Sequence, residues 1–210
     1  MHRKLLSLAF VGLVCASANA TSQINVDELA DKVEPDVIKW RHHFHEFPEL
    51  SNREFKTAEY VANYLKSLGL DVQTGVAKTG VVAILDSGNP GPVVALRADM
   101  DGLPVKEQND LSYRSTQVGE YNGKEVPVMH ACGHDTHMAM LMGAAKILTD
   151  MKGELKGKVK FIFQPAEEGA PAGEKGGAEV MVAEGVLKNP DVDAIFGLHI
   201  NANTDVGKVR

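Results

Sequence analysis

The sequence predicts an α/β fold, a three-layer sandwich in which helices cover a mostly parallel central sheet. Amphipathic helical stretches alternate with short β-branched stretches along most of the chain, and this order is typical of α/β proteins. The 210 residues have an ordinary globular composition, with 44% hydrophobic and 24% charged residues. A chain of this length can bury a substantial core.

Two helices are predicted in the first third of the chain. Between residues 25 and 46, apolar side chains recur at steps of three and four, which is the spacing of one helix face. Pro35 is expected to kink or split this helix, and Pro48 to mark its end. The second helix is predicted for residues 53–68, where Gly69 suits the terminating position.

Strands and helices alternate in the rest of the chain, because short β-branched stretches bounded by Gly, Asn or Pro are typical of strands. The predicted strands are 70–74, 81–85, 93–97, 159–164 and 192–199, the last ending at His199. The predicted helices are 138–151 and 178–187. Residues 169–177, rich in Gly, Pro and Ala, follow a strand and are interpreted as a flexible loop. Binding sites of α/β proteins form where strands end, so polar residues there are candidates for function.

The first twenty residues have the composition of a secretory signal peptide. A short positive segment that includes Arg3 and Lys4 precedes an apolar run, and Ala18 and Ala20 occupy the positions at which small residues are required for cleavage. We therefore expect residues 1–20 to be removed and the protein to be exported, to the periplasm or outside the cell. A membrane anchor is the alternative, but the run is shorter than the ~20 residues that span a bilayer.

Charge and cysteine content limit the expected partners. The formal net charge is −6 and no basic cluster interrupts the acidic excess, so nucleic acid is not an expected partner. No membrane contact is expected after signal cleavage. The mature chain keeps one cysteine, Cys132, which has no internal disulfide partner. In an oxidising compartment a lone thiol is a liability unless it is buried or bound to metal, so Cys132 is a candidate ligand.

Residues 130–137 read HACGHDTH and place one thiol and three imidazoles in eight positions. Thiolate and imidazole are the donors that zinc-like divalent ions bind. Cys132 and His134 are separated by a single glycine, so a loop can direct both at one ion. For an isolated pair of this kind, a buried thiol beside solvated histidines is the favoured explanation.

Carboxylates and a further histidine follow other predicted strands. Glu167 and Glu168 come after the strand 159–164, where one carboxylate can bind metal while the other acts as a general base. Because neighbours on an extended chain point to opposite sides, we expect them to have different roles, although a solvated acidic turn is the alternative. Asp99 and Asp101 suit the orientation of a metal-bound histidine. His199 reaches the same rim, where a lone histidine is more often structural than a ligand.

In their order along the chain, these segments resemble the M20 metallopeptidase family, and within it the amidohydrolase branch that contains hippurate hydrolases and auxin-conjugate hydrolases. The resemblance runs from about Val37 to the last residue. It is carried by residues 41–50 (RHHFHEFPEL), 95–104 (ALRADMDGLP), 130–137 (HACGHDTH), 164–169 (QPAEEG) and 197–199 (GLH). The resemblance implies a zinc-peptidase-like catalytic domain, of which residues 21–210 would be the N-terminal segment.

The resemblance also implies a mechanism and a set of site residues. The implied metal ligands are Cys132, His134, Glu168 and His199, which would hold two divalent ions, Mn²⁺ or Zn²⁺, with the thiolate between them. A hydroxide that bridges the ions would attack the amide bond of an N-acyl amino acid or a small peptide-like amide, with Glu167 as general base. The products would be a carboxylic acid and a free amino acid.

The sequence departs from the family pattern at its end. In the family, a lid or dimerisation domain interrupts the catalytic domain, which then supplies one more histidine ligand. We therefore expect an incomplete catalytic domain without the lid, an inactive 210-residue chain, and a homodimer for the full-length form. Two alternatives stay open: an inactive metal-binding fragment of the fold, and a hydrolase in which Cys132 is a nucleophile activated by His130 or His134.

Overall fold

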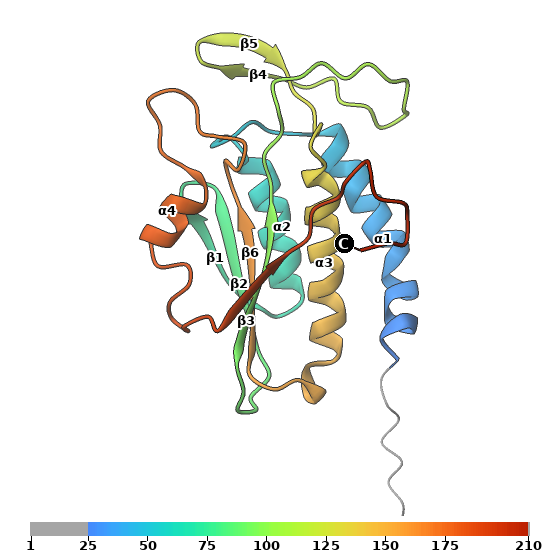
Figure 1. Ribbon diagram of the computed structural model, residues 1–210, viewed down its shortest axis with the longest axis vertical. Helices are drawn as coiled ribbons and strands as arrows, with labels where there is room; N and C mark the ends of the chain where they lie inside the picture. Colours follow the sequence, from blue (N-terminus) through green and yellow to red (C-terminus); the bar gives the residue numbers. More distant parts are fainter. Residues whose placement is uncertain (1–24, 210) are drawn as a thin grey trace, which may run out of the picture.

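The computed structural model describes residues 25–209, which form a five-stranded sheet with helices on both of its faces (Figure 1). The helices are α1 (Val26–Glu46), α2 (Phe55–Ser67), α3 (His134–Asp150), the 3₁₀ turn η1 (Lys152–Glu154) and α4 (Gly177–Ala183). The signal peptide predicted for residues 1–20 lies outside the described residues. Within residues 25–209, none of the helices has the length and apolar character that crossing a membrane requires.

The central sheet has the strand order β1-β2-β6-β3-β7. The strands are β1 (Asp71–Val76), β2 (Gly80–Asp86), β3 (Val93–Asp99), β6 (Lys158–Gln164) and β7 (Ala194–Gly197). β2 pairs antiparallel with both of its neighbours, whereas β3 pairs parallel with β6 and with β7. Four of the strands therefore run in one direction, and the predicted α/β class with its mostly parallel sheet is confirmed.

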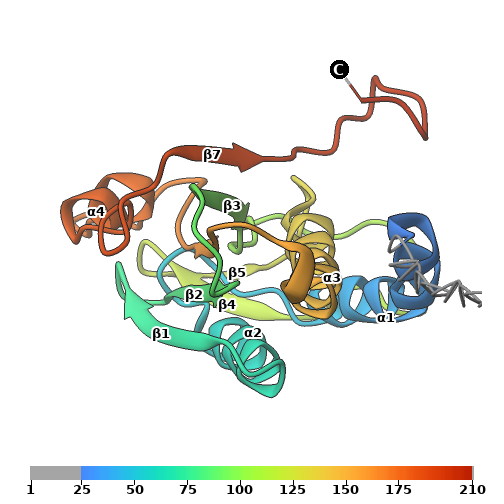
Figure 2. The ribbon, with the colours of Figure 1, turned by 90° about the horizontal axis from the view of Figure 1, so that it is seen from below.

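The two faces of the sheet bury different side chains, as the period-two alternation of a strand requires. Phe161 and Phe163 of β6 face the helices α1, α2 and α3, which lie together on one side of the sheet (Figure 2). Ile162, between them, packs on the opposite face against Met181 of α4. The amphipathic stripe of α1 explains its place in the first layer, since Val33, Trp40 and Phe44 are buried there.

Several expected boundaries are wrong. α1 continues through Pro35, which lies on the exposed side of the helix. α4 ends at Ala183, before the predicted limit of residue 187. β7 ends at Gly197, so His199 follows the strand and is not its last residue.

A second sheet, the hairpin of β4 (Val118–Tyr121) and β5 (Lys124–Pro127), was not predicted. Its turn is Asn122-Gly123, with φ of 54° and 76°. An Asn-Gly pair is the strongest short-range signal for a tight hairpin, because both central residues need positive φ. The sequence therefore contained a sufficient signal for this element.

Lys160 of β6 is 2% exposed and ties the end of the α4 region to the sheet. Its Nζ donates to the carbonyl oxygens of Val186 (2.9 Å), Lys188 (2.8 Å) and Pro190 (3.1 Å). We expect Lys160→Met to lower the free energy of unfolding by about 2 kcal/mol, because the carbonyls lose a charged donor. Urea unfolding measures this change.

The matched control for that prediction is Lys158→Met, two positions earlier on the same face of β6. Lys158 is exposed and pairs with Asp86 at the surface, where an ion pair contributes about 0–1 kcal/mol. Equal losses of stability in the two variants would contradict the role given to Lys160.

Candidate metal centre

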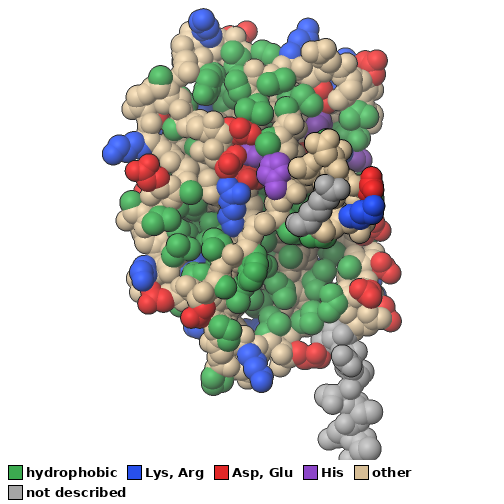
Figure 3. Space-filling model, in the orientation of Figure 1, with side chains coloured by type: hydrophobic (Ala, Val, Ile, Leu, Met, Phe, Trp, Pro, Cys, Tyr) green, Lys and Arg blue, Asp and Glu red, His purple; other side chains and the backbone are tan. Residues whose placement is uncertain are grey.

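Three segments meet at one edge of the sheet and bring the candidate residues together. Cys132 lies just before α3, and His134 is the first residue of that helix, after Gly133 with φ of 103°. Glu167 and Glu168 lie in the turn after β6, and His199 follows β7. In Figure 3, histidine and carboxylate side chains gather near the middle of the visible face, beside exposed hydrophobic side chains.

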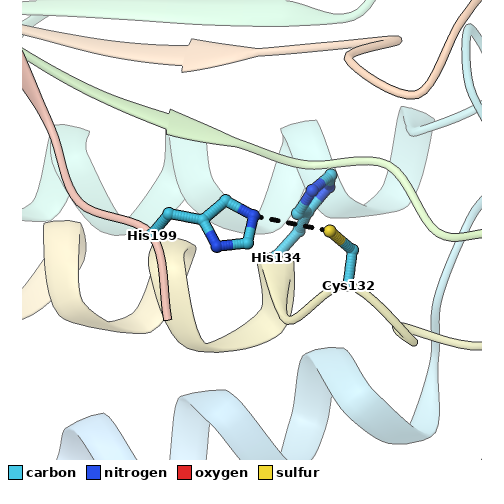
Figure 4. Close-up of side chains that lie close together, drawn as sticks. All are labelled: Cys132, His134 and His199. Carbon is cyan, nitrogen blue, oxygen red and sulfur yellow. Dashed lines mark hydrogen bonds between the residues drawn. The ribbon is translucent and has the colours of Figure 1, made fainter. Parts of the chain in front are cut away.

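Cys132, His134 and His199 form one group of possible ligands (Figure 4). The Sγ atom of Cys132 lies 3.5 Å from Nε2 of His199. On its other side, the His199 ring donates from Nδ1 to the carbonyl oxygen of Ile200. A donor at Nδ1 leaves Nε2 with a free lone pair, so the structure presents the nitrogen that a metal ion needs towards the thiol.

His134 is fully buried, yet within residues 25–209 neither of its ring nitrogens has a hydrogen-bond partner. Its Nε2 atom is surrounded by carboxylate oxygens: Asp99 Oδ1 and Glu167 Oε2 at 3.6 Å, and Glu168 Oε1 at 3.7 Å. A buried polar atom without a partner is costly.

These spacings fit a divalent ion. Donor atoms bound to a tetrahedral ion at ~2.0–2.3 Å lie roughly 3.3–3.7 Å from one another. The distances from His134 Nε2 to the carboxylates and from Cys132 Sγ to His199 Nε2 fall in this range. A cation there would satisfy the orphaned imidazole and offset the repulsion between the carboxylates.

The thiol of Cys132 is in an environment that opposes its ionisation. Burial, together with a hydrogen bond to Glu168 and the charges of Glu167 and Asp99, raises its pKa to about 12. A nucleophilic cysteine needs a lowered pKa. The surroundings thus disfavour the cysteine-nucleophile alternative, whereas a bound cation would stabilise the thiolate.

Glu167 and Glu168 do not point to opposite sides as expected for an extended chain. A carboxylate oxygen from each lies within 3.7 Å of the same His134 nitrogen. The chain turns here, because Ala166 has a φ of 49° and the N–H groups of Glu167 and Glu168 both bind Asp101. The alternation of side chains along a strand does not apply to Glu167 and Glu168, because β6 ends at Gln164.

The two aspartates after β3 orient different groups. Asp101 Oδ1 lies 3.4 Å from Nδ1 of His134, in the position predicted for a residue that orients a ligand. Asp99 instead accepts a hydrogen bond of 2.7 Å from Nδ1 of His137. Burial opposes the charged form of Asp99, but this bond and the neighbouring charges lower its pKa to about 2.

His137 holds the segment that carries His199, a role that sequence reasoning missed. Its Nδ1 donates to Asp99, and its Nε2 accepts the N–H of Ile200 at 3.0 Å. Both nitrogens are therefore used, and His137 has no lone pair left for an ion. The only sequence signal for it was its place in the HACGHDTH segment.

Two other histidines lie away from the possible ligands. His130 is buried and has no hydrogen-bond partner among the described residues, and its ring centre is 6.4 Å from that of His134. His45 lies between two carboxylates, with Nδ1 2.9 Å from Asp135 and Nε2 2.8 Å from Glu107. Both nitrogens of His45 face acceptors, so the geometry favours the doubly protonated, positively charged ring.

The loop 169–176 is anchored, although the sequence suggested a flexible one. Glu174 accepts hydrogen bonds from Arg53, Lys78 and Asn52. These contacts, Arg53 foremost, lower the pKa of Glu174. The loop that follows the glutamate pair is therefore tied to the start of α2.

His45 should make stability depend on pH. The hydrogen bond to Asp135 raises its pKa, burial acts in the opposite direction, and Glu107 adds to the rise. The protonated ring stabilises the fold, and this stabilisation is fully present below the pKa of about 6.5 that histidine has in the unfolded chain. It is lost as pH rises through the higher pKa of the folded protein. We expect the free energy of unfolding, measured by urea denaturation, to fall as pH rises above about 6.5. The fall should be steeper for the wild type than for His45→Gln. His42→Gln, which removes a ring stacked on Tyr113, is the control; parallel curves for wild type and His45→Gln would refute the prediction.

Residues 95–210 match the family of proteins described as Peptidase family M20/M25/M40. The chain belongs to this family. The resemblance inferred from the five motifs is thus confirmed.

Relatives within the M20 family cover most of this chain. An N-acyl-L-amino acid amidohydrolase of Geobacillus stearothermophilus is 44% identical over 184 residues, which are 88% of this chain and 46% of that protein. The protein named IAA-amino acid hydrolase ILR1-like 2 of Arabidopsis thaliana is 42% identical over 218 residues, covering 98% of this chain and 46% of its own length. The chain thus spans about half the length of the curated relatives it matches.

Solved M20 structures have the same fold. The YXEP protein of Bacillus subtilis, described as a dinuclear metal-binding peptidase, superimposes with a TM-score of 0.71 at 39% identity over 82% of this chain and 44% of its own. An aminobenzoyl-glutamate utilization protein from Klebsiella pneumoniae gives a TM-score of 0.65 at 29% identity, over 87% and 47% of the two chains.

Proposed function

We propose that this chain supplies the metal centre of an amidohydrolase that holds two divalent ions and cleaves the amide bond of N-acyl amino acids or small peptide-like amides. One observation carries the proposal: the buried imidazole of His134, which has no hydrogen-bond partner in the described part of the chain, faces carboxylate oxygens at 3.6–3.7 Å beside a thiol and a second imidazole. The names of the M20 relatives, amidohydrolase and dinuclear metal-binding peptidase, support the reaction and the number of ions.

Four side chains would hold the two ions: Cys132, His134, Glu168 and His199. Cys132, His134 and His199 form one group of possible donors, and Glu168 lies with His134 in a second group. Thiolate and imidazole suit Zn²⁺, while carboxylate also suits Mn²⁺, and both remain in the proposal. When bound, such ions polarise a carbonyl oxygen and lower the pKa of water towards neutrality.

Glu167 is the proposed general base. Its carboxylate reaches the same space as Glu168, but it is the more exposed of the two, with 38% against 24% of the side chain accessible. It would take a proton from the attacking water and return it to the leaving amine, as a general acid–base does. The remaining parts of the centre orient ligands: Asp101 beside His134, and His137 beside the His199 segment.

Export and a homodimeric full-length form stay expectations from the sequence. Localisation of a tagged chain in cell fractions and light scattering of the purified protein would measure the two properties.

The test is metal-dependent release of amino acids. The purified full-length form, stripped of metal and reloaded with Mn²⁺ or Zn²⁺, is incubated with a panel of N-acyl amino acids, and free amino acid is measured. We expect release that chelator abolishes. Release that persists with chelator would refute the metal mechanism. Tight metal binding without release, even by the full-length form, would favour the alternative of an inactive metal-binding fragment.

A further inference from the structure

The turn that carries the glutamate pair is held by buried carboxylates. Three consecutive backbone N–H groups point inward: that of Ala166 donates to Glu54 Oε1 at 2.8 Å, and those of Glu167 and Glu168 donate to the two oxygens of Asp101 at 3.0 Å. With the backbone N–H groups directed into the protein, the side chains of the pair are left free to approach His134.

Of the two carboxylates that bind the turn, Asp101 and Glu54, only Glu54 was not singled out by the sequence. It is the residue before α2, it is 0% exposed, and its second oxygen accepts a hydrogen bond of 2.6 Å from the hydroxyl of Thr79. A buried carboxyl is costly unless its oxygens are bonded, and one of the two bonds that satisfy Glu54 is made by the turn. Burial raises its pKa to about 7, against the effect of these bonds.

The backbone conformation of Ala166 is one that needs to be fixed by contacts such as the hydrogen bond to Glu54. Ala166 has a φ of 49°, a conformation that residues with a side chain rarely adopt, and it is 4% exposed. A Cβ added at Gly177 would stand 2.8 Å from the carbonyl oxygen of Ala166, so the chain packs closely from the other side. A residue held in this region persists when surrounding contacts fix it.

We propose that Glu54 is a positioning residue of the metal centre: by binding the N–H of Ala166 it fixes the left-handed turn that directs Glu168 to the metal and Glu167 to the reacting water. The inference rests on the proposed function for the roles of Glu167 and Glu168. The hydrogen bond itself is independent of those roles, so the two can fail separately.

Two variants distinguish loss of the hydrogen bond to Ala166 from a general loss of folding. Glu54→Leu keeps a buried side chain of similar size but leaves the Ala166 N–H without an acceptor. Glu54→Gln restores both contacts, since its amide oxygen accepts from Ala166 and its amide nitrogen donates to the Thr79 hydroxyl. Glu184→Ala is the matched control, because Glu184 also accepts a backbone N–H, that of Ala77 at 2.7 Å, away from the centre.

The first measurement is amide hydrogen exchange of the metal-free 210-residue chain by NMR. In Glu54→Leu, exchange at Ala166, Glu167 and Glu168 should accelerate by about tenfold or more, whereas Ile162 in β6 should be unaffected. Glu54→Gln and Glu184→Ala should leave the turn protected. Unchanged exchange in Glu54→Leu, or equal acceleration in Glu54→Gln, would overturn the inference.

The second measurement is titration with Co²⁺ and Zn²⁺. Loss of a residue that orients a ligand weakens metal binding by roughly 10–100-fold. Glu54→Leu should weaken the binding step that Glu168→Gln also weakens, and keep the cobalt–thiolate absorption of Cys132. Wild-type affinity at that step in Glu54→Leu would overturn the inference. A wild-type chain that binds no metal would refute the proposed function, while the exchange data would still decide whether Glu54 fixes the turn.

Discussion

Replacement of Cys132 by serine is expected to weaken divalent-metal binding by at least about a hundredfold. Cys132 supplies the only thiolate among the proposed ligands, in the group that also contains His134 and His199. A serine hydroxyl stays protonated near neutral pH and is a poor ligand compared with thiolate. Metal content after dialysis and competition with a chelator of known affinity measure the change.

The spectroscopic form of this experiment uses cobalt. Co²⁺ bound by a thiolate absorbs strongly in the near ultraviolet, and this absorption should be present in the wild type and missing in Cys132→Ser. His199→Ala should weaken binding as well, because His199 Nε2 lies 3.5 Å from the sulfur. His42→Ala, which alters a histidine of α1 stacked on Tyr113, should not. Full metal binding by Cys132→Ser would show that the ions are held elsewhere.

Replacement of Glu167 by glutamine is expected to lower kcat by about a thousandfold while metal stays bound. A positioned general base contributes typically 10²–10⁴-fold to a rate, and the amide of glutamine takes up no proton. The measurement pairs the rate of N-acyl amino acid hydrolysis by the full-length form with its metal content, because the 210-residue chain is expected to be inactive. A rate within tenfold of the wild type would mean that another group accepts the proton.

Substitutions of two other glutamates serve as comparisons for Glu167→Gln. Glu168→Gln should lose metal and activity together, because Glu168 is a proposed ligand. Glu179→Gln, at an exposed position in the first turn of α4, should change neither. If Glu167→Gln lost metal as Glu168→Gln does, the division of roles between the pair would be wrong.

Local pattern explains most of what the sequence predicted. The apolar stripe of α1, the β-branched strands β2, β3 and β6 and the alternation of helices and strands are properties of neighbouring residues, and they predict the α/β class. The motif order predicts the family, and it singles out Cys132, His134, Glu168 and His199 before any geometry is known. Residue type and order were sufficient there because metal chemistry accepts few side chains.

Contacts between distant residues were decided by the tertiary structure. β2 reverses direction beside β6, and nothing in its own residues states which strand it will pair with. Glu54 and Ala166 are 112 positions apart, and only folding makes them partners. Likewise, the two glutamates face one histidine because Asp101 binds their N–H groups, which periodicity along a strand does not reveal.

The sequence by itself thus determined the fold class, the family and the chemical identity of the candidate ligands. The tertiary structure decided which nitrogen of each histidine is free, which carboxylates orient and which approach the ion, and how the turn at Ala166 is fixed. The physical reason for this division is that residue type and local spacing are properties of the sequence itself. A hydrogen bond between distant segments exists only after the hydrophobic faces of the helices and the sheet have packed together.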